Sequence, residues 1–331
     1  MTLPTNILSS DQFEKDDIDY LCSLATKIRS IAKSKEGLIF LKHLLSHKRA
    51  MLYFTQPSTR TFLSFYSACQ ILGMGVAEVR DPTTSSEFKG ETQTDSIRTL
   101  SSYFDLLIIR SKEKDLPRIT ATLFANSERP IPIINAGSGS DEHPTQALLD
   151  IYTLQRSFEH LGGLANKTIM FVGDLKRGRT VRSLSKLLTK YDAIRQCFIA
   201  PEQLQISEDI IEYLKSKSNM YKLSDEFEEY LKIADAVYLT RIQSEWDTYS
   251  ETKKIDISKF CFQKHHLDII KPTAIIMHPL PRRVEIDTDV DTDSRAMYWR
   301  QVRNGMWIRV ALIANMFSAD KDISNYPLWG F

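Results

Sequence analysis

Hydroxyl and cationic side chains gather where the sequence predicts the starts of helices and the ends of strands. Ser58-Thr59-Arg60-Thr61 follows an apolar strand and opens a helix. The N-terminus of a helix presents free backbone N–H groups and a partial positive charge, so it can bind phosphate. Arg60 adds a guanidinium that can hold two phosphate oxygens at once. A helix cap beside a surface arginine explains this tetrapeptide equally well.

Three more motifs in the first half carry polar residues, and each also has a simpler explanation. Ser85 and Lys89 lie in the segment SSEFKGE, which by itself is typical of a solvated loop. Arg110 ends the run DLLIIR, where a surface ion pair is the commoner role. His143 and Gln146 open a helix, where histidine can donate to a carbonyl oxygen and glutamine can contact an amide NH2.

The second half has three comparable motifs. Arg179 follows GDLKRG, which lacks the G-x-G-x-x-G spacing of a dinucleotide site, so we reject cofactor binding there. Arg241 and Gln243 follow a strand, and Leu280 lies in HPLPR, whose two prolines force an irregular turn. Singly, these signals are weak. Together they favour a small polyanionic substrate, because five cationic residues stand at strand ends and loops: Arg60, Lys89, Arg110, Arg179 and Arg241.

The elements that must position these residues alternate along the chain. Short β-rich runs followed by helical periodicity are typical of α/β architecture. We interpret each half as a small parallel sheet covered by helices, in which ligands bind beyond the carboxyl ends of the strands. The predicted strands are 50–54, 74–79, 105–110, 130–137, 166–175, 195–201, 234–242 and 273–281, and the predicted helices include 62–73, 92–104, 179–191 and 306–317.

A strong helix is predicted at 144–158, with an apolar side built from leucines and Tyr152. We expect Asp150 and the polar residues around it to face outward. A chain of 331 residues favours two domains, and this helix is placed to link them. The apolar helix at 306–317 is long enough to pack back onto the first domain.

Composition narrows the class of protein. Lys and Arg number 43 against 42 Asp and Glu, which gives no electrostatic reason to expect nucleic acid or an anionic membrane as partner. Four widely spaced cysteines fit reduced thiols better than a zinc site or a disulfide framework. The first residues form no apolar signal segment, and no apolar run reaches the ~18 residues of a membrane span. We therefore expect a cytoplasmic protein.

The combined motifs resemble the catalytic chain of aspartate transcarbamoylases. STRT, S-x-x-x-K-G-E, a strand-end arginine, HPTQ, GDLKxGRT, TRxQ and HPLPR occur in the order and spacing of that family, from about Ala50 to the C-terminus. Ornithine transcarbamoylases share STRT and HPxQ but carry HCLP where this chain has HPLP. The resemblance implies transfer of the carbamoyl group of carbamoyl phosphate to the amine of L-aspartate, an early step of de novo pyrimidine biosynthesis.

The resemblance also implies a role for each matching residue. Catalysis would fall to Arg60, Thr61, Lys89, Arg110 and His143. Carbamoyl phosphate would be held by these five together with Ser58, Thr59, Ser85 and Gln146. Aspartate would be held by Lys89, Arg179, Arg241, Gln243 and the backbone of Leu280, with a cis Leu280–Pro281 bond. No metal and no cofactor is implied.

The family's architecture sets further expectations. It implies two doubly wound parallel-sheet domains with the active site in the cleft between them. Residues 1–147 plus 304–331 would bind carbamoyl phosphate, and residues 148–303 would bind aspartate. Ser85 and Lys89 would enter the site from a neighbouring subunit, which implies a homotrimer. The sequence leaves open whether a regulatory subunit or another pyrimidine-pathway enzyme associates.

The sequence departs from the family pattern at two positions, and it leaves two alternative functions to weigh against the resemblance. Gln56 and Trp246 replace a glutamate and an arginine that link the domains in well-studied members, so we expect domain closure to rely less on that ion pair. One alternative is a transcarbamoylase for another amine acceptor, and the retained Arg179 and Arg241 argue against it. The other is a non-catalytic paralogue, against which the intact STRT motif and Lys89 argue.

Overall fold

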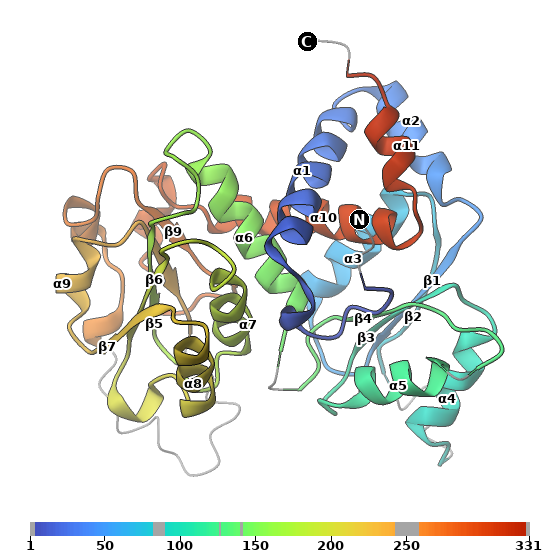
Figure 1. Ribbon diagram of the computed structural model, residues 1–331, viewed down its shortest axis with the longest axis horizontal. Coiled ribbons are helices and arrows are strands. Elements are labelled where there is room, and N and C mark those ends of the chain that lie inside the picture. The colour runs from blue at the N-terminus through green and yellow to red at the C-terminus, as the bar shows by residue number, and fades with distance from the viewer. Residues whose placement is uncertain (1–3, 82–89, 126, 140–141, 242–257, 329–331) are drawn as a thin grey trace. The chain divides into compact units, whose positions relative to one another are not determined.

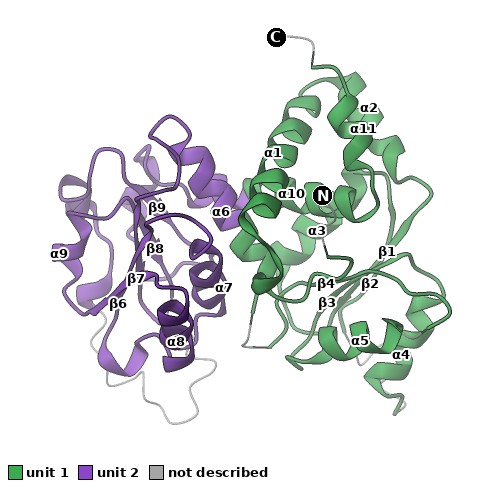
Figure 2. Ribbon diagram, in the orientation of Figure 1, with its two compact units in different colours: residues 1–148, 304–331 green, residues 149–303 purple. Residues whose placement is uncertain are grey.

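The computed structural model describes residues 4–81, 90–125, 127–139, 142–241 and 258–328. The chain forms two compact units (Figure 2). Unit 1 comprises Met1–Leu148 and Asn304–Phe331, and unit 2 comprises Leu149–Arg303. Within the described ranges, every helix is too short or too polar to cross a membrane.

Unit 1 is built on a four-stranded parallel sheet (Figure 1). Its strand order is β2-β1-β3-β4. The strands are β1 (Arg49–Phe54), β2 (Gly75–Val79), β3 (Leu106–Arg110) and β4 (Ile133–Asn135). Strand β3 is buried along its whole length, as expected for an apolar strand in the middle of a parallel sheet. Because all four strands run the same way, their carboxyl ends lie at one edge.

Helices cover this sheet. Ser34 begins one of them by accepting a hydrogen bond from the Gly37 backbone N–H, at 2.9 Å. The two helices that precede β1 were not predicted, and their buried apolar side chains include Ile18, Leu21 and Leu41. The elements that belong wholly to unit 1 are η1 (Ser10–Gln12), α1 (Lys15–Ile31), α2 (Lys35–Leu44), α3 (Thr59–Ile71), α4 (Gln93–Ser101), α5 (Leu116–Ala125) and α11 (Asp320–Asn325).

Unit 2 contains a second parallel sheet, of five strands in the order β7-β6-β5-β8-β9. They are β5 (Thr168–Val172), β6 (Arg195–Ile199), β7 (Met220–Ser224), β8 (Ala236–Leu239) and β9 (Ile275–Met277). The edge strand β7 was not predicted, because none of its residues is buried and Lys222 and Ser224 interrupt its apolar residues. The other elements are α7 (Arg179–Leu188), η4 (Glu202–Leu204), α8 (Glu208–Ser216), α9 (Phe227–Leu231), η7 (Ser258–Phe260), η8 (Lys264–Asp268) and η9 (Thr288–Thr292).

Two helices cross the boundary between the units, and both correct the sequence reading. Helix α6 (Pro144–Phe158) has the predicted ends, but Asp150 is fully buried instead of facing outward. The Tyr238 hydroxyl and the Gln301 side-chain amide donate to its carboxylate at 2.8 Å and 2.6 Å. A buried carboxylate is tolerable only with such partners. Helix α10 (Tyr298–Met316) starts well before residue 306, and α11 follows it.

The predicted fold class is confirmed in its main feature, two parallel sheets covered by helices.

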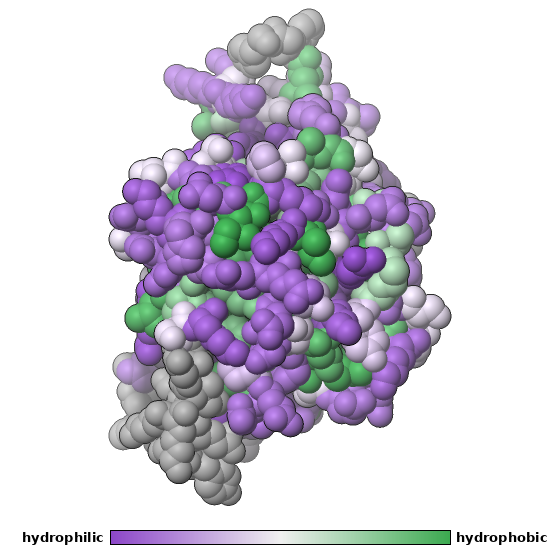
Figure 3. All heavy atoms as spheres, turned by 90° about the vertical axis from the view of Figure 1, so that its left-hand side faces the viewer, coloured by the Kyte–Doolittle hydropathy of each residue, from purple (hydrophilic) through white to green (hydrophobic). Residues whose placement is uncertain are grey.

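The four cysteines all lie in the described part of the chain, and all four are free thiols, three of them buried. Burial raises the pKa of the Cys69 thiol to about 12. On the face shown in Figure 3, hydrophobic side chains form small patches separated by hydrophilic ones. Buried apolar side chains form the cores of the two units.

Candidate active site

The carboxyl ends of β1, β3 and β4 meet at one edge of the unit 1 sheet. Phe54 at the end of β1 pairs with Arg110, and Ile109 pairs with Asn135 at the end of β4. The Ser58–Thr61 segment follows β1, and the loop that leads to His143 follows β4. The topology thus delivers three of the predicted motifs to the same edge.

Ser58–Thr61 forms the start of helix α3. Ser58 is the extended N-cap residue, and its side chain caps no backbone N–H of the helix. Thr59 and Arg60 are exposed in the first turn, whereas Thr61 is 8% exposed. The capping explanation for Ser58 therefore fails, and the first-turn N–H groups with their hydroxyls are suited to an oxyanion.

Thr61, Arg110 and His143 are brought together in unit 1. The Thr61 Oγ1 atom lies 3.5 Å from the His143 Nε2 atom. The Arg110 Nη1 group donates to the Ala136 carbonyl oxygen at 3.0 Å. All three side chains are buried, so their polar atoms act in a medium of low dielectric constant. Such donors can stabilise negative charge that develops on a substrate oxygen.

Gly137 makes this grouping possible. It has a φ of +93°, and a Cβ atom there would lie 2.7 Å from His143 Cδ2 and 2.8 Å from Arg110 Nη1. Any side chain would push the two apart, so only glycine fits. The Asn135 side chain fixes the turn by accepting the N–H groups of Gly137 and Ser138, both at 2.9 Å. The sequence reading missed these two residues, although a glycine directly before the His143 loop was the available signal.

Gln146 of α6 and Arg309 of α10 are two further polar residues of unit 1. Gln146 lies in the first turn of α6, is 9% exposed and donates its backbone N–H to the His143 carbonyl. Arg309 of α10 donates to the Ser64 hydroxyl of α3 at 2.7 Å and to the Thr145 hydroxyl of α6 at 3.4 Å. Arg309 therefore ties the second turn of α3 to the first turn of α6, a contact that no sequence motif predicted.

In unit 2, the neighbouring strands β5, β8 and β9 also end at one edge. Arg179 is the first residue of α7, after β5, and Arg241 follows Thr240 at the end of β8. Gly173 has a φ of +110°, and a Cβ atom there would lie 2.2 Å from the Thr240 carbonyl oxygen. Glycine therefore lets the segments that carry the two arginines approach each other.

Leu280 lies in the loop that follows β9. Its φ is +55°, a left-handed conformation that costs a non-glycine residue roughly 1–2 kcal/mol, so the surroundings must hold it. The predicted cis bond between Leu280 and Pro281 is confirmed. Polar contacts on both sides of the bend provide that support.

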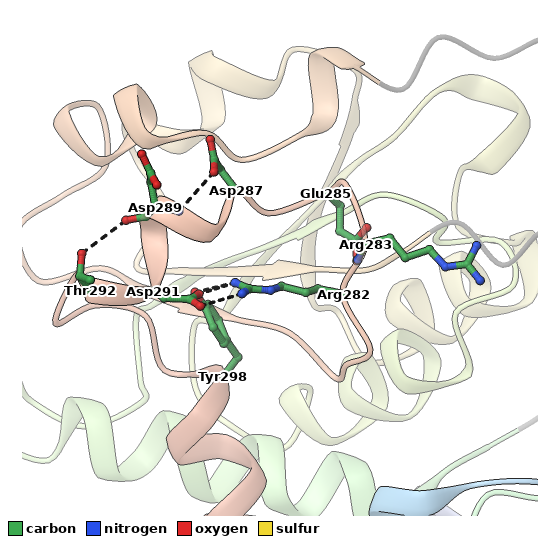
Figure 4. A network of polar contacts seen from close by, with 8 residues as sticks. All are labelled: Arg282, Arg283, Glu285, Asp287, Asp289, Asp291, Thr292 and Tyr298. Carbon is green, nitrogen blue, oxygen red and sulfur yellow. Dashed lines mark hydrogen bonds and ion pairs between the residues drawn. The ribbon is translucent and has the colours of Figure 1, made fainter.

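Arg282 anchors the far side of this loop (Figure 4). Its guanidinium forms a two-pronged ion pair with Asp291, with Nη2 2.6 Å from Oδ2. The Tyr298 hydroxyl donates to the same carboxylate. Burial and the neighbouring Asp291 raise the pKa of Tyr298, so its hydroxyl remains a donor.

Four residues singled out from the sequence lie outside the described residues. They are Ser85, Lys89, Gln243 and Trp246. Gln56 is described: it is 9% exposed, and its backbone N–H donates to the Arg110 carbonyl oxygen at 3.2 Å.

One group of side chains within the described ranges has the composition of a metal site: Glu228, His265 and His266. The His266 Nδ1 atom accepts the Gln263 backbone N–H at 2.8 Å. A neutral His266 therefore carries its proton on Nε2, which lies 3.8 Å from the Glu228 carboxylate. A metal at Nε2 would have to displace that proton, so this group is better explained as a cap of η8.

Comparison with known proteins matches the two halves of the chain separately. The family of aspartate/ornithine carbamoyltransferases matches residues 5–156 through its carbamoyl-P binding domain and residues 165–316 through its Asp/Orn binding domain. The chain belongs to the aspartate/ornithine carbamoyltransferase family. The likeness begins well before Ala50, where the sequence motifs placed its start.

Individual carbamoyltransferases are similar over nearly the whole chain. The chloroplastic aspartate carbamoyltransferase of Arabidopsis thaliana is 40% identical over 93% of this chain and 77% of its own length. The aspartate carbamoyltransferase catalytic subunit of Methanobrevibacter smithii is 36% identical over 98% and 96%. Aspartate transcarbamoylase of Trypanosoma cruzi, solved with N-(phosphonacetyl)-L-aspartic acid, has a TM-score of 0.84 at 36% identity, covering 93% of this chain and 94% of that one.

The Arg282–Asp291 pair of this carbamoyltransferase predicts a pH-dependent stability. Hydrogen bonds from Arg282 hold the pKa of Asp291 below its ordinary value of 3.8, against the opposing effect of burial and with help from Tyr298. A lowered folded-state pKa gives stability that is complete above the unfolded-state pKa and is lost as the pH falls through the folded-state pKa. Asp291→Asn should therefore lower the free energy of unfolding at pH 7 by about 1–3 kcal/mol, and this loss should shrink as the pH falls below the ordinary value of 3.8.

Urea denaturation of the wild-type and Asp291→Asn chains between about pH 2 and pH 7 checks this. The control is Asp289→Asn, an exposed aspartate of the same segment. Equal losses for the two variants, or a loss that does not change with pH, would contradict the assigned role of the pair.

Proposed function

We propose that this chain is an aspartate carbamoyltransferase. It transfers the carbamoyl group of carbamoyl phosphate to the amine of L-aspartate and yields N-carbamoyl-L-aspartate and phosphate. The observation that carries the proposal is the buried grouping of Thr61, Arg110 and His143 around Gly137, at the carboxyl edge of a parallel sheet. Its family membership and the aspartate carbamoyltransferases to which it is similar support the choice of reaction.

The proposed first-substrate site lies in unit 1. The N–H groups and hydroxyls of Ser58–Thr61, with the Arg60 guanidinium, bind the phosphate. Thr61, Arg110 and His143 donate to the carbamoyl carbonyl oxygen, and Gln146 holds the carbamoyl NH2. One set of groups thus binds the anionic end of the substrate, and the other binds its reactive carbamoyl group.

The proposed second-substrate groups lie in unit 2. Arg179 and Arg241 each neutralise one carboxylate of aspartate, and Gln243 assists. The backbone carbonyl of Leu280 accepts a hydrogen bond from the amine. Guanidinium groups at the carboxyl ends of neighbouring strands suit a dicarboxylate better than the cationic side chain of ornithine.

The chemical step follows from these placements. The amine nitrogen attacks the carbamoyl carbon, the new C–N bond forms, and the bond to the phosphate oxygen breaks. A proton passes from the amine to the departing phosphate. Negative charge gathers first on the carbonyl oxygen, where losing one of the three donors should cost on the order of 3 kcal/mol. Holding two bound reactants in line can supply roughly 7–11 kcal/mol of the barrier reduction.

The proposed working form is a homotrimer. Ser85 and Lys89 of one subunit complete the site of its neighbour. The proposed setting is de novo pyrimidine biosynthesis in the cytoplasm, which free thiols suit. The plant relative is named as chloroplastic, so the compartment is a separate prediction for this chain. Association with a regulatory subunit or another pyrimidine enzyme would be additional to the trimer.

A direct assay tests the reaction. The purified chain is mixed with carbamoyl phosphate and L-aspartate, with L-ornithine in a parallel tube, and the carbamoylated products are quantified. We expect product with aspartate only. Product mainly with ornithine would contradict the assigned roles of Arg179 and Arg241, and product with neither would indicate a non-catalytic paralogue.

Mixing two inactive variants tests the shared site. Arg60→Ala and Lys89→Ala chains are denatured together and refolded. In random mixed trimers, one site in each hybrid has both native residues, so about a quarter of the wild-type activity should return. Each variant refolded alone is the control. No recovery by a mixture that sediments as a trimer would show that each subunit builds its site alone.

A further inference from the structure

His278 is a buried residue of unit 2 whose two ring nitrogens have different partners. It follows β9 directly and is 1% exposed. The Leu280 backbone N–H donates to its Nδ1 atom at 2.7 Å. Its Nε2 atom lies 2.7 Å from the Glu285 Oε1 atom. The ring therefore bridges the Leu280 bend and the chain that leaves it.

These contacts fix the tautomer of the ring. A nitrogen that accepts an N–H carries no proton, so neutral His278 carries its proton on Nε2 and donates it to Glu285. The Glu285 carboxylate also accepts the Arg283 backbone N–H at 3.0 Å; Figure 4 shows both residues beside the loop. Burial raises the pKa of Glu285, but the contacts with His278 and the hydrogen bonds from backbone N–H groups together leave the pKa below its ordinary value.

The backbone of His278 is held as firmly as its ring. Its N–H donates to the Gln301 Oε1 atom at 3.0 Å. The side-chain amide of Gln301 donates in turn to Asp150, which also accepts the Tyr238 hydroxyl. This chain of hydrogen bonds ties the residue to α10, α6 and β8. The ring is thus a fixed point from which the loop is positioned.

We propose that His278 is a positioning residue for the second substrate. Its Nδ1 atom holds the Leu280 N–H, stabilises the left-handed conformation of Leu280 and thereby sets the direction of the Leu280 carbonyl oxygen. The inference rests on the proposed function, in which that oxygen accepts a hydrogen bond from the aspartate amine. His278 itself touches no substrate and acts through Leu280.

The tautomer is essential to this role. A proton on Nδ1 would set two N–H donors against each other in a buried place, and the Leu280 peptide would have to turn away. Glu285 prevents this by binding the proton on the opposite nitrogen. The pair therefore explains why a histidine and a glutamate, rather than two apolar residues, are buried beside the loop.

Two substitutions separate the ring nitrogens. Asparagine can place its Oδ1 atom where Nδ1 lies, whereas glutamine reaches the position of Nε2 and leaves the Leu280 N–H without its acceptor. His278→Gln should raise the KM for aspartate about tenfold or more and change the KM for carbamoyl phosphate less than about twofold. His278→Asn should restore the KM for aspartate to within about threefold of wild type. His160→Gln, at an exposed histidine, is the matched control.

Equal effects of the two substitutions, or parallel changes in both KM values, would overturn the proposal in favour of a merely structural role. If His278→Gln does not fold, nitrogen NMR of the 15N-histidine-labelled wild-type chain tests the tautomer of His278 directly. We expect the Nε2–H tautomer for the signal that is lost in His278→Asn, and an Nδ1–H tautomer would overturn the proposal. The NMR result is independent of turnover. A wild-type chain that is inactive with aspartate would instead refute the proposed function.

Discussion

The parallel direction of the strands is the constraint on which the rest of the structure depends. In each unit, every strand of the sheet ends at the same edge. Polar residues that are distant in sequence therefore meet wherever they directly follow a strand. Ser58–Thr61, Arg110 and His143 meet in this way in unit 1, and Arg179, Arg241 and Leu280 follow neighbouring strands in unit 2.

Close approach at these edges requires residues that break ordinary local preferences. Gly137 and Gly173 take left-handed conformations because a side chain would collide with Arg110 and His143 in one case and with the Thr240 backbone in the other. Leu280 takes such a conformation without being glycine, and its N–H bond to His278 compensates. Close approach at both edges thus depends on residues that depart from local preference.

The sequence predicted the buried strands well, because apolar runs bounded by loops are a strong signal, as in β3 and β5. It missed β7, an edge strand with no buried residue, and it turned Asp150 outward because periodicity treats every carboxylate as solvated. Motifs placed Arg110 and His143 at strand ends and loops. They could not show Gly137, Arg309 or Glu285, whose roles depend on contacts between segments distant in sequence or on the path of the backbone.

A crystal structure of this chain with N-(phosphonacetyl)-L-aspartate bound would test the central claim most directly. We expect the phosphonate on the N–H groups of Ser58–Thr61 and the amide carbonyl oxygen within hydrogen-bond distance of Thr61, Arg110 and His143. The two aspartyl carboxylates should contact Arg179 and Arg241. An amide carbonyl held by other residues, with the Thr61 and His143 side chains turned away from the ligand, would contradict the account.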